Sequence, residues 1–171
     1  MIILGIDPGI AIVGYGVIEY TKGKFRPIGM GSIETPAGID VEERLKTVYE
    51  DMCEIIDTYR PDEMVIEELF FNTNQKTAIA VAEARGVILL SAVQKGVPIS
   101  EYTPLQVKQS VVGYGRAEKK QVMSLVKMIL GMENGPKLDD TADALALAIC
   151  HAHVGGSRIQ DYYNQKKKRL L

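Results

Sequence analysis

The chain is poor in the features that mark exported and membrane proteins. Among its 171 residues there are only two cysteines, Cys53 and Cys150, and both fall in helical patterns rather than in the spaced framework of a disulfide-rich protein. No apolar run approaches the ~18 residues of a membrane span. The first residues carry an acid, Asp7, where a signal peptide would carry basic residues. The sequence therefore predicts a cytoplasmic protein that is neither exported nor bound to a membrane.

Proline is also scarce. Seven prolines, 46% hydrophobic residues and 25% charged residues suit one soluble domain with room for a full core. We expect this domain to cover residues 1–155. Periodicity stops near Gly155, so residues 156–171 are expected to form a basic, mobile tail.

Neither sign of charge predominates overall, because the net charge is only −2. The acidic and basic residues are nevertheless segregated along the chain. Acids dominate residues 34–68, whereas residues 106–130 carry one acid, Glu118, among several basic side chains. These basic residues are Lys108, Arg116, Lys119, Lys120 and Lys127. A stretch of this kind is either the footprint of a phosphate backbone or a solvated helix face, and charge alone leaves both interpretations open.

Two apolar runs end abruptly in acids. The run over residues 2–6 stops at Asp7 and a Pro-Gly turn, and the run over residues 64–66 stops at Glu67 and Glu68. Such runs are typical of strands buried on both faces. Asp7 then either begins a turn through its own backbone or stands as a functional acid at the edge of a sheet.

The remaining patterns predict an α/β fold with a five-stranded mixed sheet, three strands antiparallel and then two parallel, and helices on both faces. Asp40 and Glu43 are expected to form a capping box. The alanine-rich helix, which includes Ala82 and Ala84, is expected to let a second copy approach closely in a two-fold dimer. Strands are expected over residues 2–7, 12–20, 25–34, 63–70 and 97–102, and helices over residues 40–60, 74–95, 104–112, 117–130 and 139–153.

A further pair of acids opens a helix. Asp140 and Asp143 are three residues apart at the start of a strongly apolar helix, so both side chains project from one face of its first turn. Acids at this place are also ordinary helix caps, favoured by the helix dipole. Capping and ligand binding both remain open for this pair.

Taken together, the acids indicate a metal site. Four carboxylates at one sheet edge repel and raise each other's pKa, so a divalent cation among them stabilises the arrangement. Because no His or Cys set accompanies them, Mg²⁺ or Mn²⁺ is favoured, and His151 and His153 are interpreted as structural. Two such ions can clamp the attacking and leaving oxygens of a phosphoryl displacement. Nucleic-acid cleavage fits both this chemistry and the basic stretch.

Several spaced motifs resemble those of the RuvC-type Holliday junction resolvases, which have a ribonuclease H-like fold. The resemblance covers nearly the whole chain. The motifs are Gly5-Ile6-Asp7-Pro8-Gly9 with Gly14-Tyr15-Gly16, then Ile66-Glu67 before Phe70, then Val107-Lys108-Gln109 through Val112-Gly113-Tyr114-Gly115 and Ala117-Glu118-Lys119, and finally Asp140-Thr141-Ala142-Asp143-Ala144-Leu145-Ala146.

The resemblance implies a homodimer that binds four-way junction DNA in recombination and repair. It would make paired, symmetric, Mg-dependent nicks that leave ligatable ends, and it would work with a branch-migration helicase complex. One departure is Glu68, which stands where some relatives carry an amide.

The resemblance also assigns roles to single residues. It implies that Asp7, Glu67, Asp140 and Asp143 bind two Mg²⁺ ions and are catalytic. Lys108 and Lys119 match basic residues of the cleft, and Phe70 matches an aromatic that stacks on an unpaired base near the crossover. We expect Lys119 to lie near the scissile phosphate, and Lys108, Arg116 and Lys120 to hold the DNA backbone.

Two other classes of protein compete with this interpretation. Actin-like sugar kinases also end their first strand in Gly-x-Asp before a Gly turn, but they need two such domains. A binding-only module would recognise junctions with acids that are structural remnants. Mg²⁺-dependent nicking of a synthetic junction separates all three.

Overall fold

β1 (Ile2–Asp7), formed by the first apolar run, is the central strand of a mixed sheet. The computed structural model describes residues 1–68, 75–134 and 139–154, with the backbone alone for residues 75–77. Within these ranges the other strands are β2 (Ile12–Thr21), β3 (Lys24–Glu34), β4 (Glu63–Glu67) and β5 (Ile99–Tyr102). The helices are α1 (Val41–Tyr59), α2 (Gln75–Gln94), α3 (Pro104–Val112), α4 (Lys119–Ile129) and α5 (Asp139–Val154).

The strand order is β3-β2-β1-β4-β5, which confirms the predicted sheet. The pairs β3-β2 and β2-β1 are antiparallel, and the pairs β1-β4 and β4-β5 are parallel. Each parallel strand is reached through a helix, as parallel pairing requires. All carboxyl ends of β1, β4 and β5 therefore meet at one edge of the sheet.

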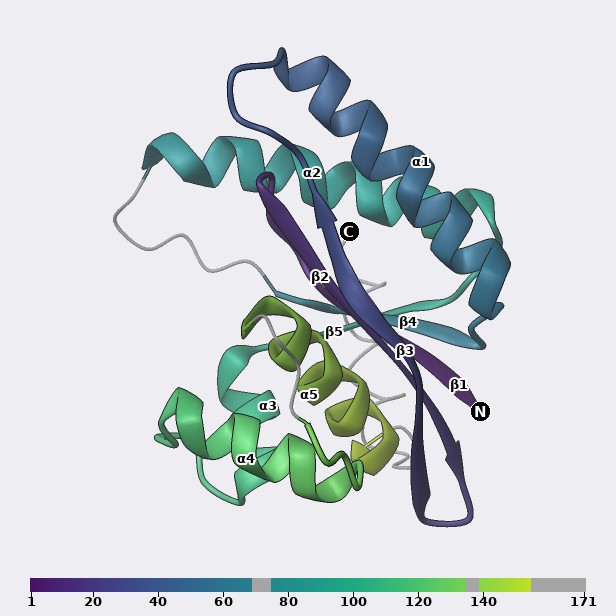
Figure 1. Cartoon of the computed structure of the whole chain (residues 1–171), viewed down its shortest axis with the longest axis vertical. Helices are drawn as coiled ribbons and strands as arrows, with labels where there is room; N and C mark the ends of the chain where they lie inside the picture. Colours follow the sequence, from purple (N-terminus) through teal and green to yellow (C-terminus); the bar gives the residue numbers. More distant parts are fainter. Residues whose placement is uncertain (69–74, 135–138, 155–171) are drawn as a thin grey trace, which may run out of the picture.

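Helices cover both faces, as predicted. Figure 1 shows α1 and α2 on one side of the sheet and α3, α4 and α5 on the other. Alternate side chains of β1 enter the two cores, with Ile3 under α3, α4 and α5 and with Leu4 and Ile6 under α1 and α2. No helix in the described ranges is both long and apolar enough to cross a bilayer.

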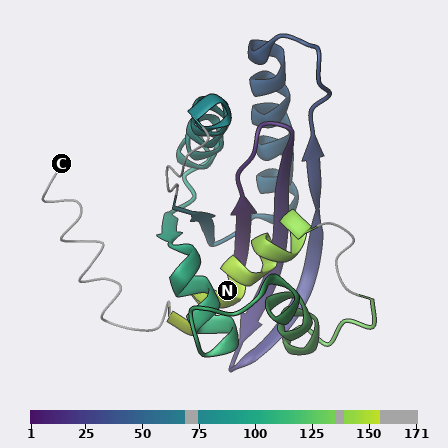
Figure 2. The same ribbon diagram turned by 90° about the vertical axis from the view of Figure 1, so that its left-hand side faces the viewer.

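Glycines let α5 lie directly on β1 and β2, which it crosses in the turned view of Figure 2. A Cβ atom added at Gly5 would stand 1.9 Å from the carbonyl oxygen of Ala144, and one at Gly14 would stand 2.2 Å from that of Asp140. At Gly16 it would meet the Leu145 side chain at 2.6 Å. Any side chain at these positions would lift the helix from the sheet.

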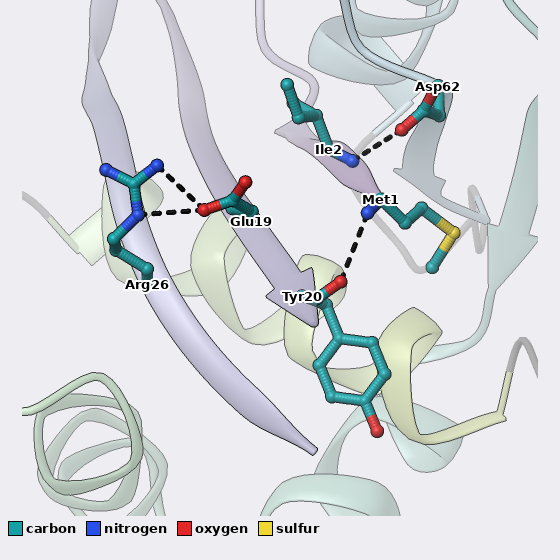
Figure 3. A network of polar contacts seen from close by, with 6 residues as sticks. All are labelled: Met1, Ile2, Glu19, Tyr20, Arg26 and Asp62. Atoms are coloured by element: carbon teal, nitrogen blue, oxygen red, sulfur yellow. Dashed lines mark hydrogen bonds and ion pairs between the residues drawn. The ribbon is translucent and has the colours of Figure 1, made fainter. Parts of the chain in front are cut away.

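The amino end of β1 is fixed by polar contacts, drawn in Figure 3. The Met1 ammonium donates to the Tyr20 carbonyl oxygen at 3.1 Å, and the Ile2 N–H donates to Asp62 Oδ2 at 2.7 Å. Beside them, an Arg26–Glu19 ion pair with an N–O distance of 2.7 Å bridges β2 and β3. β1 is therefore held in register from its first residue.

Some element ends differ from the prediction. β4 ends at Glu67, and residues 69–74 lie outside the described residues. α1 does follow Asp40, but the Asp40 side chain makes no cap hydrogen bond, so the predicted capping box is wrong. The start of α1 is exposed, which leaves water to satisfy its first N–H groups.

Candidate active site

β1 and β4 bring Asp7 and Glu67 to the same edge and the same face of the sheet. Gly5 pairs with Val65 in the parallel register, so the residues two positions further along share that face. Val65 belongs to the core under α5, whereas Ile66 belongs to the core under α1 and α2. Alternation therefore directs Glu67 to the α5 side with Asp7, and Glu68 to the other side.

α5 brings the remaining two acids to this edge. It begins at Asp139, so Asp140 lies within the first turn rather than before it. The close approach at Gly14 sets the Asp140 backbone against β2, and Thr141 Oγ1 donates to the Gly31 carbonyl oxygen of β3 at 3.1 Å. The first turn of α5 is thus fixed to two strands, with Asp143 one turn further along.

The pKa values show how strongly these acids interact. Burial, followed by the charges of Glu67, Asp143 and Asp140, raises the pKa of Asp7 to about 8, against a smaller opposing effect of Lys119. Burial and the Asp143 charge also raise the pKa of Glu67. The pKa of Asp143 is raised mainly by burial, while Lys119 opposes the rise. The edge is thus an anionic site whose charges repel one another.

Lys119 forms ion pairs with two acids at this edge. Its Nζ atom lies 3.0 Å from Asp143 Oδ2 and 3.4 Å from Asp139 Oδ2. The sequence motifs predict no role for Asp139, although its place directly before Asp140 in the first turn of α5 is a signal for one. The Lys119 side chain is 49% exposed, so solvent screens both pairs and leaves the ammonium accessible to an anion.

A pocket of about 210 Å³ opens beside the acids. Its lining combines charged side chains of both signs with apolar side chains. The charged residues are Glu67, Lys108, Lys119 and Asp143, and the apolar ones are Pro104, Val107, Val122 and Leu147. Carboxylates beside ammonium groups suit a metal-assisted reaction on an anionic substrate such as a phosphodiester.

The donor set at this edge is the kind that a hard divalent cation takes, because it is anionic and consists of oxygen alone. A cation would also relieve the repulsion that raises the pKa of Asp7. As the side chains stand, no three His, Cys, Asp or Glu groups among the described residues are close enough to hold one ion together. The fit therefore rests on donor chemistry and charge.

The other predicted residues lie at varying places. Arg116 and Lys120 are exposed around the start of α4 and do not line the pocket. Phe70 and the predicted tail over residues 156–171 lie outside the described residues.

His151 and His153 lie at the far end of α5 and also do not line the pocket. His151 is 3% exposed. Its Nδ1 atom lies 2.9 Å from the Tyr102 hydroxyl, and its Nε2 atom lies 2.9 Å from Glu63 Oε2. These contacts join α5 to β4 and β5, in keeping with a structural part for His151.

The chain resembles known proteins over most of its length. Residues 3–151 match the family model of crossover junction endodeoxyribonuclease RuvC. The protein of that name from Alkaliphilus oremlandii is 58% identical over 155 residues, which cover 91% of this chain and 94% of the relative. The one from Clostridioides difficile is 59% identical over 153 residues, which cover 90% of each chain.

Solved structures agree with this result. The Thermus thermophilus RuvC structure is 36% identical, with a TM-score of 0.85 over 91% of this chain and 96% of that one. T. thermophilus RuvC in complex with Holliday junction substrate is 35% identical, with a TM-score of 0.87 over 91% of this chain and 94% of that one. Yeast mitochondrial Ydc2, at 14% identity and a TM-score of 0.64, shares the fold.

The family model spans the domain, the relatives are nearly 60% identical, and the ribonuclease H-like sheet gathers four acids at one edge. The chain therefore belongs to the RuvC family of crossover junction endodeoxyribonucleases and resolves Holliday junctions.

Proposed function

We propose that this chain cuts four-way junction DNA by paired, symmetric, Mg²⁺-dependent nicks in recombination and repair, leaving ends that a ligase can seal. The observation that carries the proposal is the convergence of Asp7, Glu67, Asp140 and Asp143. Burial, together with the charges of the other three acids, raises the pKa of Asp7 to about 8. The junction-bound relative supports the choice of substrate.

The four acids would hold two Mg²⁺ ions, for which Mn²⁺ substitutes. When bound, the ions activate water and stabilise the departing 3′ oxygen. The chain contributes the rigid placement of the acids, Asp7 and Glu67 at strand ends and Asp140 and Asp143 on a helix fixed to the sheet. Sites on such elements hold their ligands more closely than sites on loops.

Lys119 would stabilise the charge that develops on the scissile phosphate. Its side chain is half exposed and lines the pocket, and its ammonium lies beside Asp143. Lys108 shares the pocket lining, and Arg116 and Lys120 extend the basic surface outside it. These three would hold the DNA backbone, while Phe70 would stack on an unpaired base near the crossover.

We further propose that the enzyme is a homodimer paired through α2. Ile79, Leu90 and Val93 are 68%, 49% and 65% exposed, and their spacing places them on one face of the helix. The opposite face, with Ala84 fully buried, packs in the protein's own core, so the close approach expected at Ala84 is made within the chain. An apolar stripe of this kind marks an interaction surface.

The family resemblance also motivates a branch-migration helicase complex as partner and a cytoplasmic location. Nothing in this proposal depends on either.

The Asp7→Asn variant tests the catalytic role of the acids. We expect it to bind a synthetic junction like the wild type but to nick it roughly 10²-fold more slowly or worse, because the amide keeps the shape and removes the charge that attracts the metal. Gel assays with and without Mg²⁺ measure both properties. Glu68→Gln is the matched control and should nick normally, since Glu68 points to the other face. A wild type that binds junctions without nicking them in Mg²⁺ would indicate a binding-only module.

The same variant should be more stable than the wild type at neutral pH in EDTA. Asp7 ionises near pH 3.8 in the unfolded chain but near pH 8 in the folded one, so the wild type loses stability as the pH rises between these values. The Asn variant escapes this loss, which is on the order of a few kcal/mol at about 1.4 kcal/mol per pKa unit. Urea melts at pH 4 to 8.5 should therefore show that the free energies of unfolding of the wild type and of Asp7→Asn move apart as the pH rises. Parallel stability curves over that range contradict the raised pKa.

Lys119→Ala and Lys120→Ala should differ although they are neighbours, because they lie about 100° apart on α4. Lys119→Ala should lower the nicking rate at saturating junction. Lys120→Ala should weaken binding and reduce the slope of log K against log salt by about one. Single-turnover rates and salt titrations measure these effects. Equal effects of both changes on rate and on slope would overturn the assignment.

Leu90→Lys and Val93→Lys should each weaken the free energy of dimerisation by at least about 2 kcal/mol and so yield monomers. The reason is that a charge would enter the buried centre of the interface. Sedimentation at micromolar concentration measures the outcome. Met128→Lys is the matched control, because Met128 is 71% exposed on α4, away from the stripe. A monomeric wild type, or equal dissociation of the Met128 variant, refutes pairing through α2.

A further inference from the structure

The loop that follows Asp7 is held by a residue far along the chain. β1 and β2 pair only as far as Asp7 and Gly14, so residues 8–11 extend past the ladder of these two strands. Thr35, the first residue after β3, contacts this loop. Its N–H donates to the Ala11 carbonyl oxygen at 3.0 Å, and its Oγ1 atom donates to the Ile10 carbonyl oxygen. Two successive loop carbonyls are therefore bonded to one residue, which is only 5% exposed.

Arg44, in the first turns of α1, fixes Thr35 in turn. Its Nε atom donates to Thr35 Oγ1 at 2.9 Å, and its Nη2 atom reaches the Thr35 carbonyl oxygen at 3.5 Å. A hydroxyl has one proton to give, so accepting from a guanidinium directs the Thr35 proton to Ile10. A charged donor also strengthens the bond that it makes. We call this chain of contacts, Arg44 to Thr35 to Ile10, the loop brace.

The loop brace acts on the end of β1 that leads to the acids. The other end of the strand is held by the Met1, Ile2 and Asp62 contacts of Figure 3. The loop itself is tight, because a Cβ atom added at Gly9 would stand 2.2 Å from the Ile12 carbonyl oxygen. A tight turn held by side-chain bonds leaves little freedom to the carboxylate just before it.

We propose that Thr35 and Arg44 are positioning residues for Asp7. The inference rests on the proposed function, since it takes Asp7 as a metal-binding acid. Neither residue lines the pocket, and neither is among the groups that shift the pKa of Asp7. By fixing the Ile10 carbonyl they fix the turn, and the turn fixes the direction in which the Asp7 carboxylate meets Glu67 and Asp143. A displacement of about 1 Å in such a group can cost about 10²-fold in rate.

The decisive variant is Thr35→Val, which keeps the shape of the side chain and removes its hydroxyl. We expect about tenfold weaker binding of Mn²⁺ alone, measured by calorimetry without DNA, and a kcat about 10²-fold lower. KM for the junction should stay within about twofold, because the DNA contacts are untouched. Thr35→Ser, which restores the hydroxyl, should return both quantities to near wild type.

Thr47→Val is the matched control. Thr47 lies on α1, near Arg44, and its hydroxyl donates to the Glu43 carbonyl oxygen at 3.0 Å, so the change removes one similar bond elsewhere. It should leave Mn²⁺ affinity and kcat unchanged. If Thr35→Val does not fold, Arg44→Met carries the test, because it removes the donors and keeps most of the stem; its effects should run in the same direction.

Asp7→Asn serves as the reference for Mn²⁺ affinity. One outcome is that Asp7→Asn weakens Mn²⁺ binding, whereas Thr35→Val and Arg44→Met keep both Mn²⁺ affinity and kcat at wild-type values. The positioning role is then overturned while the proposed function stands. If Asp7→Asn itself leaves Mn²⁺ binding unchanged, both are overturned. A Thr35→Val variant with a raised KM for the junction and normal Mn²⁺ binding would also overturn the positioning role of the loop brace.

Discussion

The close contact between α5 and the sheet is the constraint on which the site depends. Two of the four acids lie on this helix and the other two end strands beneath it, so their distances follow from how near the helix lies. Gly5 and Gly14 set that distance, because the helix carbonyls occupy the space of any Cβ atom there. The apolar character of α5 has the same origin, since a helix pressed on a sheet and covered by α3 and α4 buries nearly its whole circumference.

Burying acids and gathering them in this way has an electrostatic cost, which appears in the raised pKa of Asp7, Glu67 and Asp143. Stability from the two hydrophobic cores offsets that cost, and a charge-neutralising ligand at the edge lowers it. The fold thus places repelling charges at the edge where we propose that a cation and a phosphate bind. Lys119 supplies part of the neutralisation from a side chain that remains half exposed.

Much of the fold could be predicted from the sequence, because its signals are local. The strand runs, the helical stripes and the order of elements predict the sheet topology. The period of two along β4 predicts that Glu67 and Glu68 face opposite sides, and the family resemblance selects Glu67, which the register directs toward α5. The roles of the four acids stay predictions. Local signals also explain one error, since Asp40 has the right spacing for a capping box while water serves the exposed helix start equally well.

The remaining features could not be predicted, because they join residues without a periodic relation. Thr35 contacts Ile10 across 25 positions, and the contact depends on how far β3 extends beyond β1. The burial of Ala84 within the chain's own core depends on which face α2 turns to α1. Spacing cannot reveal either, whereas both follow at once from the register and the layers.

The doubled acid at the end of β4 has a consequence for how the gene can change length. The apolar residues Met64, Val65 and Ile66 are all buried, so a shift by one residue exchanges apolar side chains between the two cores and exposes none of them to water. A deletion of one codon within β4 would turn Glu67 away from α5 and bring Glu68 to its place. The strand would then still end in a carboxylate on the side of Asp7. In α5, Asp139 would take the place of Asp140 after a similar loss further along the helix, but Asp143 has no such spare: it would rotate by about 100° away from the sheet edge and Ala142 would take its place.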